Sequence, residues 1–253
     1  MKSTEKFTCK ADNYRKYRPS YPDEFIEYLQ SNVGLSKSSV VADIGAGTGI
    51  LTRLISPISG RVLAVEPNES MRDAGIKYCE DLANVSYFDG CAENTGLNDQ
   101  SLDFITVAQA FHWFDKERTK IEFRRVLKPE GKVVLVWNSR VPDNEMVIEN
   151  DNICRRLCKD FTGFSGGSGS EEESISSFFS NGRFERREFS NDRILSLEEF
   201  IGGSLSASYS PNLNDPNYDD FVESLKMLFF KYNVDGKLVL PNITQSYTGI
   251  IDP

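Results

Sequence analysis

Residues 40–137 carry two alternating patterns of apolar and polar positions. Short apolar runs that predict buried strands lie at 40–42, 62–65, 85–88, 102–108 and 133–137. Stretches with apolar residues at helical spacing lie between them, as at 50–55, 69–79 and 115–127. Strands that are apolar on both faces and alternate with helices indicate a parallel sheet covered on both sides. Right-handed crossovers make such a sheet doubly wound.

The pattern differs on either side of this unit. A helix with one apolar face is predicted to begin after Tyr21 and Pro22 and to reach Val33. Later helices are predicted at 145–160, 172–180, 196–206 and 217–232, and strands at 184–189 and 238–247. The Ser/Gly tract at 165–170 predicts a flexible segment.

These patterns together predict an α/β fold. It contains a mostly parallel seven-stranded sheet with helices on both faces and a helical cap or lid inserted late in the chain. We divide the chain into a leader and helix (1–38), a core (39–140), and a segment that completes the sheet and carries the cap (141–253).

Composition narrows the function. The 253 residues carry a formal net charge of −9, which disfavours nucleic acid as a partner. No run of eighteen apolar residues exists and the first residues are polar, so we expect no membrane span and no secretory signal. Five cysteines fit no disulfide framework, and free thiols indicate a reducing compartment. We therefore expect a cytoplasmic monomer or homodimer.

A glycine-rich turn follows the first predicted strand and opens a helix. It reads Asp43-Ile44-Gly45-Ala46-Gly47-Thr48-Gly49. Its glycines permit positive φ and close approach of a ligand, and the helix that follows directs N–H groups at that ligand. The dinucleotide fingerprint requires a glycine at the position of Ile50, so the spacing disfavours NAD. Glu66 ends the second strand, where a carboxylate accepts hydrogen bonds from ribose hydroxyls.

This loop with its two acidic partners resembles motif I of class I S-adenosylmethionine (SAM)-dependent methyltransferases, which have a Rossmann-like fold. Further segments are similar to that family at 65–71, 90–97, 109–114 and 127–132. The leader 14–22 resembles the type 11 subgroup, in which trans-aconitate methyltransferases are relatives. The resemblance implies that the leader covers the cofactor site and that 141–253 contributes to the methyl-acceptor site.

The resemblance also implies a set of cofactor-binding residues: Asp43, Gly45, Ala46, Gly47, Gly49, Glu66, Pro67, Met71, Cys91, Ala92, Glu93, Gln109 and Tyr17. Met71 is expected against the adenine. Cys91 departs from the family, because many members have an acidic residue there that receives the adenine amino group, and a thiol is a weak acceptor. Asp89 or Glu93 is the alternative acceptor.

The expected activity is methyl transfer from SAM to a small molecule, with a carboxylate oxygen as the leading methyl acceptor. A sulfonium methyl group needs no metal, and a base is needed only where the methyl acceptor must lose a proton. The candidate residues are His112, as a base or as part of the pocket wall, and Arg18 and Arg140, as anion anchors or surface charges. Two alternatives are an NAD(P)-dependent oxidoreductase and a non-catalytic SAM-binding protein.

Overall fold

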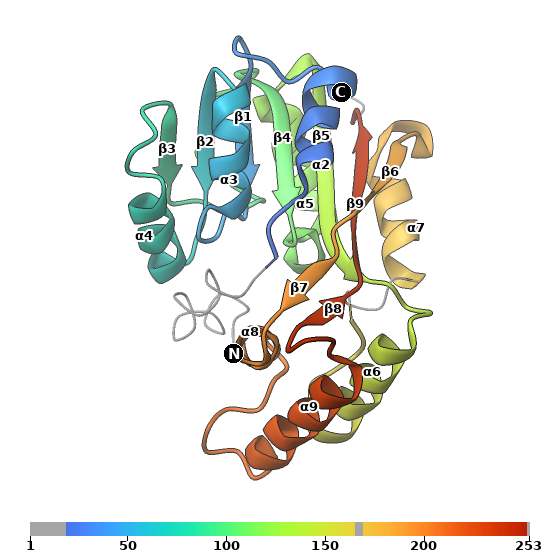
Figure 1. The fold of residues 1–253 in the computed structure, drawn as a ribbon. Helices are drawn as coiled ribbons and strands as arrows, with labels where there is room; N and C mark the ends of the chain where they lie inside the picture. The colour runs from blue at the N-terminus through green and yellow to red at the C-terminus, as the bar shows by residue number, and fades with distance from the viewer. Residues whose placement is uncertain (1–18, 165–168, 252–253) are drawn as a thin grey trace.

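A computed structural model describes residues 19–164 and 169–251. In this part of the chain, one seven-stranded sheet has the order β3-β2-β1-β4-β5-β9-β6 (Figure 1). Its strands are β1 Val40–Ile44, β2 Arg61–Val65, β3 Val85–Phe88, β4 Leu102–Ala108, β5 Leu127–Arg140, β6 Glu185–Ser190 and β9 Asn242–Gly249. The first five are parallel, and β9 pairs antiparallel with both β5 and β6. The predicted fold class is confirmed.

Helices cover both faces of the sheet because alternate strand residues are apolar in both directions. On one face, α2 Asp23–Tyr28, its π-helical extension Leu29–Val33 and α3 Ile50–Ile55 pack on Val134 and Val136. The opposite face packs Val133, Leu135 and Trp137 against α5 Lys116–Val126 and α7 Gly169–Phe178. Helix α4 Glu69–Tyr78 contacts β3.

Polar residues before the helices define where several of them begin. The side chains of Asn68, Asp115 and Asn144 accept hydrogen bonds from backbone N–H groups in the first turns of α4, α5 and α6 Glu145–Leu157. Each bond satisfies a donor that the helix itself leaves unpaired. The predicted cap at Asp115 is confirmed.

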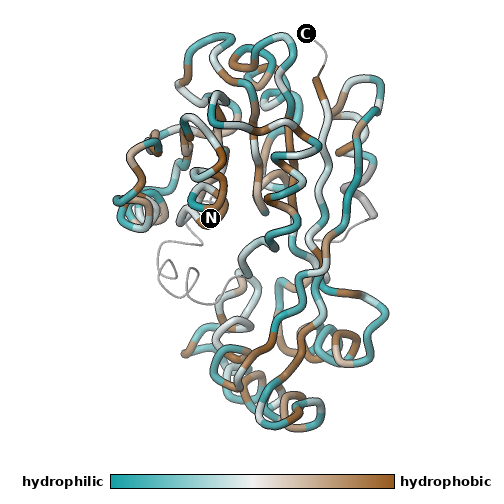
Figure 2. Tube along the Cα trace, turned by 45° about the horizontal axis from the view of Figure 1, so that its top comes forward, coloured by the Kyte–Doolittle hydropathy of each residue, from teal (hydrophilic) through white to brown (hydrophobic). Residues whose placement is uncertain are grey.

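A second unit lies at the end of the sheet where the parallel strands finish (Figure 1). We call it the cap. It comprises α6, α8 Leu197–Leu205, α9 Tyr218–Tyr232 and a two-stranded antiparallel sheet of β7 Arg193–Leu195 and β8 Leu238–Leu240. Its own core contains fully buried Phe200, Phe221 and Leu225. Figure 2 shows hydrophobic segments on both the sheet and the cap.

Three expectations require correction. The single strand predicted over 238–247 is wrong, because Pro241 separates β8 in the cap from β9 in the main sheet, and proline has no N–H for a sheet ladder. Strand β7 was not predicted, since three residues give too short a pattern. Within the Ser/Gly tract, 165–168 lie outside the described residues, whereas Gly169 and Ser170 begin α7.

The described cysteines are free thiols. Cys79, Cys154 and Cys158 are buried and Cys91 is half-buried. Cys9 lies outside the described residues. The prediction of unpaired thiols is confirmed for the described positions.

Candidate functional site

The glycine loop joins β1 to α3 at the edge of the sheet that faces the cap. Gly45, Gly47 and Gly49 all have positive φ, between +56° and +84°. A Cβ at Gly45 would lie 2.7 Å from Ala110 Cβ, so only glycine lets the loop lie this close to the end of β4. The Gly45 and Ala46 N–H groups donate to Val65 O at 2.9 and 3.1 Å, which fixes the loop to β2.

Gly49 has a different task from the other two glycines. A Cβ there would lie 2.4 Å from Tyr87 Oη and 3.1 Å from Cys79 Sγ. Gly49 is absent from the described linings of the two cavities beside the loop. Its lack of a side chain allows α3 to pack closely on β3 and α4, and it does not bring the loop to a ligand.

Asp43 lies beneath the loop and is only 1% exposed. Its carboxylate accepts hydrogen bonds from Thr52 Oγ1 at 2.6 Å and Thr106 Oγ1 at 2.9 Å. Burial raises the pKa of Asp43 to about 6, although the two hydroxyl groups oppose that shift. The side chain therefore connects β1, α3 and β4 below the site, and neither cavity lining includes it.

Glu66 lies directly after β2 and is 8% exposed. Its Oε2 accepts from Gly47 N and its Oε1 from Asn68 N, both at 2.9 Å. Burial raises its pKa, and these backbone donors oppose the rise. Each carboxylate oxygen has a second lone pair, so Glu66 can still accept hydrogen bonds from a ligand.

A cavity of about 180 Å³ opens at Glu66, and we call it the Glu66 cavity. Its walls are mainly apolar or aromatic beside a few polar groups: Gly45, Gly47, Glu66, Pro67, Asn68, Met71, Cys91, Ala92, Glu93, Ala108, Gln109, Ala110, Trp113 and Phe114. This set includes most of the residues that the family resemblance assigned to the cofactor.

The two alternative partners for an adenine amino group are separated in space. Glu93 lines the Glu66 cavity, and its Oε1 also accepts from Asp115 N at 2.8 Å. Asp89 forms an ion pair with Arg72 at 3.2 Å, is largely exposed, and is not in that lining. The geometry therefore favours Glu93 over Asp89.

A second cavity of about 180 Å³ continues from the first, and we call it the Arg140 cavity. The two share Gly45, Gly47, Ala108 and Gln109. Gln109 follows β4 with a φ of +56°, and its Nε2 donates to Asn138 O at 3.2 Å. The polar residues that line only the second cavity are Tyr21, Thr48, Asn138, Arg140, Arg193, Tyr209 and Asn242.

Arg140 ends β5 at the junction of the sheet and the cap. Its Nη1 donates to Asn242 Oδ1 at 3.0 Å, and its guanidinium lies 5.6 Å from the centre of the Phe164 ring. Arg193 of β7 lines the same cavity from the cap side. The sequence did not indicate Arg193 or Tyr209, because only the pairing of distant segments brings them to the cleft.

The other candidate residues do not join this group in the described structure. His112 lies in the 3-10 helix Phe111–Trp113, is exposed, and has its ring 4.7 Å from that of Trp113. It is not among the described residues that line either cavity. Tyr17 and Arg18 lie outside the described residues.

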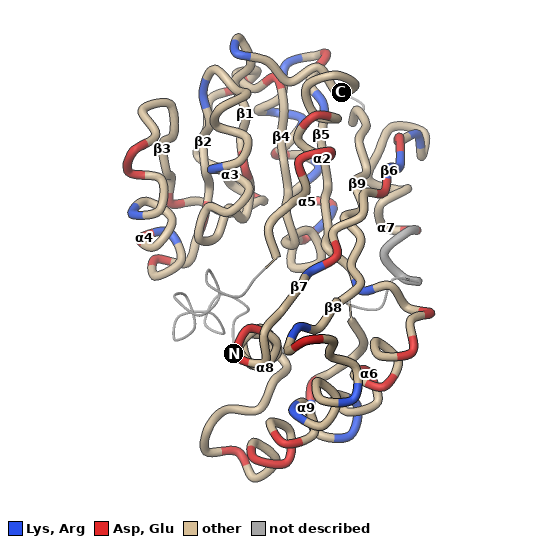
Figure 3. Tube along the Cα trace, in the orientation of Figure 1, with Lys and Arg blue, Asp and Glu red and all other residues tan. Residues whose placement is uncertain are grey.

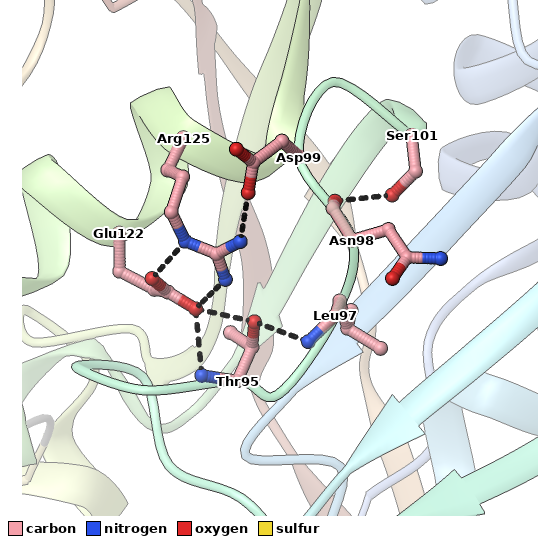
Figure 4. Close-up of polar contacts among 7 residues, drawn as sticks. All are labelled: Thr95, Leu97, Asn98, Asp99, Ser101, Glu122 and Arg125. Carbon is pink, nitrogen blue, oxygen red and sulfur yellow. Dashed lines mark hydrogen bonds and ion pairs between the residues drawn. The ribbon is translucent and has the colours of Figure 1, made fainter.

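A polar network fixes the loop that follows β3 (Figure 4). Glu122 Oε1 accepts from Thr95 N at 2.8 Å, and Arg125 donates to both oxygens of Glu122 and to Asp99. Burial alone would raise the pKa of Glu122, but the bonds from Arg125 and Thr95 outweigh it and lower the pKa to about 2. Sequence spacing gave no sign of this network, because Thr95 and Glu122 belong to different elements.

The comparisons with known proteins agree with this arrangement. Residues 42–135, which contain β1, β2 and β4 with the glycine loop and Glu66, match the family model described as a methyltransferase domain. These residues form a SAM-dependent methyltransferase domain. An uncharacterized methyltransferase of Schizosaccharomyces pombe is 37% identical over 136 residues, which are 53% of each chain. One of Mycobacterium bovis is 40% identical over 127 residues, 50% of this chain and 49% of the relative.

The chain thus spans about half the length of these two relatives. Among solved structures, a candidate type II methyltransferase of Anaeromyxobacter dehalogenans has a TM-score of 0.67 at 22% identity. That match covers 94% of this chain and 99% of the other, and it shows a shared fold beyond the methyltransferase domain. No helix in 19–164 or 169–251 is long and apolar enough to cross a membrane.

The residues of the methyltransferase domain fit SAM. Glu66 offers lone pairs to hydroxyl groups beside the flat apolar walls of Met71, Trp113 and Phe114. The glycine loop brings backbone to both cavities, and a Cβ at Gly47 would come within 3.4 Å of Met71 Cε. Such a pair of connected cavities suits a ligand with a nucleoside at one end and an amino acid at the other.

Proposed function

We propose that this chain is a cytoplasmic methyltransferase that transfers the methyl group of SAM to a carboxylate oxygen of a small molecule. One observation carries the proposal. Arg140 and Arg193 line a cavity that shares Gly45, Gly47 and Gln109 with the cavity containing Glu66. An anion anchor therefore adjoins the site that fits the cofactor. The finer resemblance to trans-aconitate methyltransferases, whose substrate is a carboxylate, agrees with this proposal.

Each part of the site has a proposed task. Glu66 accepts hydrogen bonds from the ribose, Met71 and Phe114 contact the adenine, and Glu93 receives its amino group. The glycine loop holds the methionine part, together with Gln109. The leader 1–38 covers the cofactor, residues 39–140 hold it, and 141–253 complete the sheet and the methyl-acceptor site.

When bound, SAM supplies an electrophilic methyl group, which an oxygen lone pair attacks as the carbon–sulfur electron pair moves to sulfur. The chain has to hold the methyl acceptor in line with that group. A carboxylate is already ionised at neutral pH, so no base is needed, and the paired N–H groups of Arg140 suit its two oxygens. The exposed position of His112 outside both cavity linings also favours a methyl acceptor that needs no base.

The cofactor assignment is tested by calorimetry with S-adenosylhomocysteine. We expect Glu66→Gln to weaken binding by about 1.5–3 kcal/mol, because a charged hydrogen-bond partner is lost. Asp89→Asn is the matched control and should bind normally, since Asp89 is largely exposed and lies outside the cavity lining. Tight binding of NAD with none of S-adenosylhomocysteine would instead support the oxidoreductase alternative.

The methyl-acceptor class is tested by a turnover screen over carboxylic acids, phenols and amines. With a carboxylate substrate, Arg140→Gln or Arg193→Gln should raise KM sharply, whereas His112→Ala should leave turnover largely intact. Arg18→Ala tests whether the leader contributes to the same anchor. If His112→Ala removes a limb of the pH profile near neutrality and the arginine changes have no effect, the methyl acceptor requires deprotonation. Cofactor binding without any turnover would identify a non-catalytic SAM-binding protein.

A further inference from the structure

A third cavity lies beside the cleft on the sheet face that carries α7. Its volume is about 550 Å³, larger than either cavity at the glycine loop, and we call it the side chamber. The chamber is lined by residues of β5, β9, α6 and the segment 162–164. Arg140 and Phe164 line both the side chamber and the Arg140 cavity, so this cation–ring pair forms the boundary between them.

The walls of the side chamber are mixed in chemistry. Trp137, Ile243 and Tyr247 present apolar surface from the sheet, and Val147 does so from α6. The charged lining residues are Arg140, Arg155, Arg186 and Asp151. This local excess of cations contrasts with the net charge of −9 for the chain. Figure 3 shows acidic and basic segments interspersed over the sheet and the cap, so the excess belongs to the chamber and not to a basic face.

Trp137 adds an independent observation. It is 4% exposed and lines the chamber, and its indole Nε1 has no hydrogen-bond partner among the described residues. A buried donor without a partner is unfavourable, and most such groups in folded proteins are satisfied. A ligand with an acceptor atom at this wall would satisfy it.

We propose that the side chamber binds the apolar body of a monocarboxylic acid whose carboxylate lies against Arg140 at the boundary with the cleft. A chamber of this size suits a body with a ring or a chain of several carbons, because ligand sites in proteins commonly range from about 300 to 1,000 Å³. This inference rests on the proposed function in one respect: the bound acid is the methyl acceptor. Binding in the chamber can nevertheless be measured without methyl transfer.

The chain contains two tryptophans, and each lines a different cavity. In the Trp113→Phe chain, the remaining indole at position 137 reports on the chamber alone. We expect cyclohexanecarboxylate to change its fluorescence and to bind at least about tenfold more tightly than cyclohexanecarboxamide or acetate, since each lacks one recognised feature. Equal affinity for the acid and its amide, or no change in emission, would overturn the proposal.

Asn152→Phe in the same background places a ring at the chamber wall from an exposed position on α6. Lys77→Phe, on exposed α4 and outside the described cavity linings, is the matched control. We expect the first to weaken cyclohexanecarboxylate binding at least about tenfold and the second to leave it unchanged, as steric exclusion predicts. Equal binding by both variants would exclude the chamber as the site. Binding of the acid without its methylation would support the chamber and contradict the proposed function.

Discussion

Two buried carboxylates lie within one loop of each other and have different partners. Asp43 is bonded to two threonine hydroxyls below the glycine loop, while Glu66 is bonded to two backbone N–H groups beside it. The first connects the elements that carry the loop, and the second connects the loop to its cavity. Sequence motifs treat both as ligand-binding positions, but burial assigns Asp43 a structural task.

The raised pKa of Asp43 has a measurable consequence. Its value of about 6 in the folded chain exceeds the usual value of about 3.8, so the folded state binds the proton more tightly and loses stability as pH rises through this window. Relative to Asp43→Asn, the free energy of unfolding of the native chain should fall by about 2 kcal/mol between pH 4.5 and pH 7. Denaturant unfolding at both pH values measures it, and a pH-independent difference would contradict the assignment.

The structural task of Gly49 is testable against Gly34, which also has positive φ but has open space within 4 Å of the point where a Cβ would lie. Gly34→Ala should cost about 1–2 kcal/mol through backbone strain alone. Gly49→Ala should cost a further 1–3 kcal/mol or so, because its Cβ would overlap Tyr87 Oη. Thermal unfolding provides the measurement. Tyr87→Phe in the Gly49→Ala chain should recover part of the loss, and equal costs at the two glycines would refute this explanation.

At the scale of elements, α5 holds the loop after β3 against the sheet. That loop includes Cys91, Ala92 and Glu93, which line the Glu66 cavity, and Thr95, whose N–H and hydroxyl both reach Glu122. The position of the cavity wall therefore depends on a carboxylate that contacts no ligand site itself.

Replacing Glu122 by Gln should destabilise the chain by about 1.5–3 kcal/mol, since charged hydrogen bonds are lost from a buried group. The pKa of Glu122 is lowered to about 2 from 4.5, so its contribution is present above about pH 4.5 and lost as pH falls toward 2. Hydrogen exchange over 91–97 should also accelerate at neutral pH. Glu117→Gln, on the exposed first turn of α5, is the control. Unchanged exchange at 91–97 would show that the network does not position the loop.

For the whole molecule, the sequence predicts the sheet better than the cap. Strands such as Leu102–Ala108 are continuous apolar runs, and the glycine loop has fixed spacing, so local pattern suffices. The Arg140 cavity depends instead on Arg193, Tyr209 and Asn242, which come together only when the chain returns through β7 and β8. Local pattern carries no information on such contacts, and Pro241 was the one visible sign of where the two sheets divide.

The separate core of the cap makes it a distinct unit of stability. Phe221→Ala on α9 removes a fully buried ring and should cost about 3–5 kcal/mol, with exchange in the cap accelerating more than in β1 and β4. Phe230→Ala on the same helix is the control, because that ring is 66% exposed and should change stability by less than about 0.5 kcal/mol. Equal acceleration in the sheet and the cap would indicate one cooperative unit instead.

The position of β9 between β5 and β6 also affects how the chain is made. During synthesis, β5 emerges from the ribosome more than a hundred residues before its partner Asn242–Gly249. Until then, a long hydrophobic strand has one edge without a partner, and such edges pair readily with other chains. The nascent protein therefore depends on chaperone protection, or on slow aggregation, for the interval in which its last core strand is still being translated.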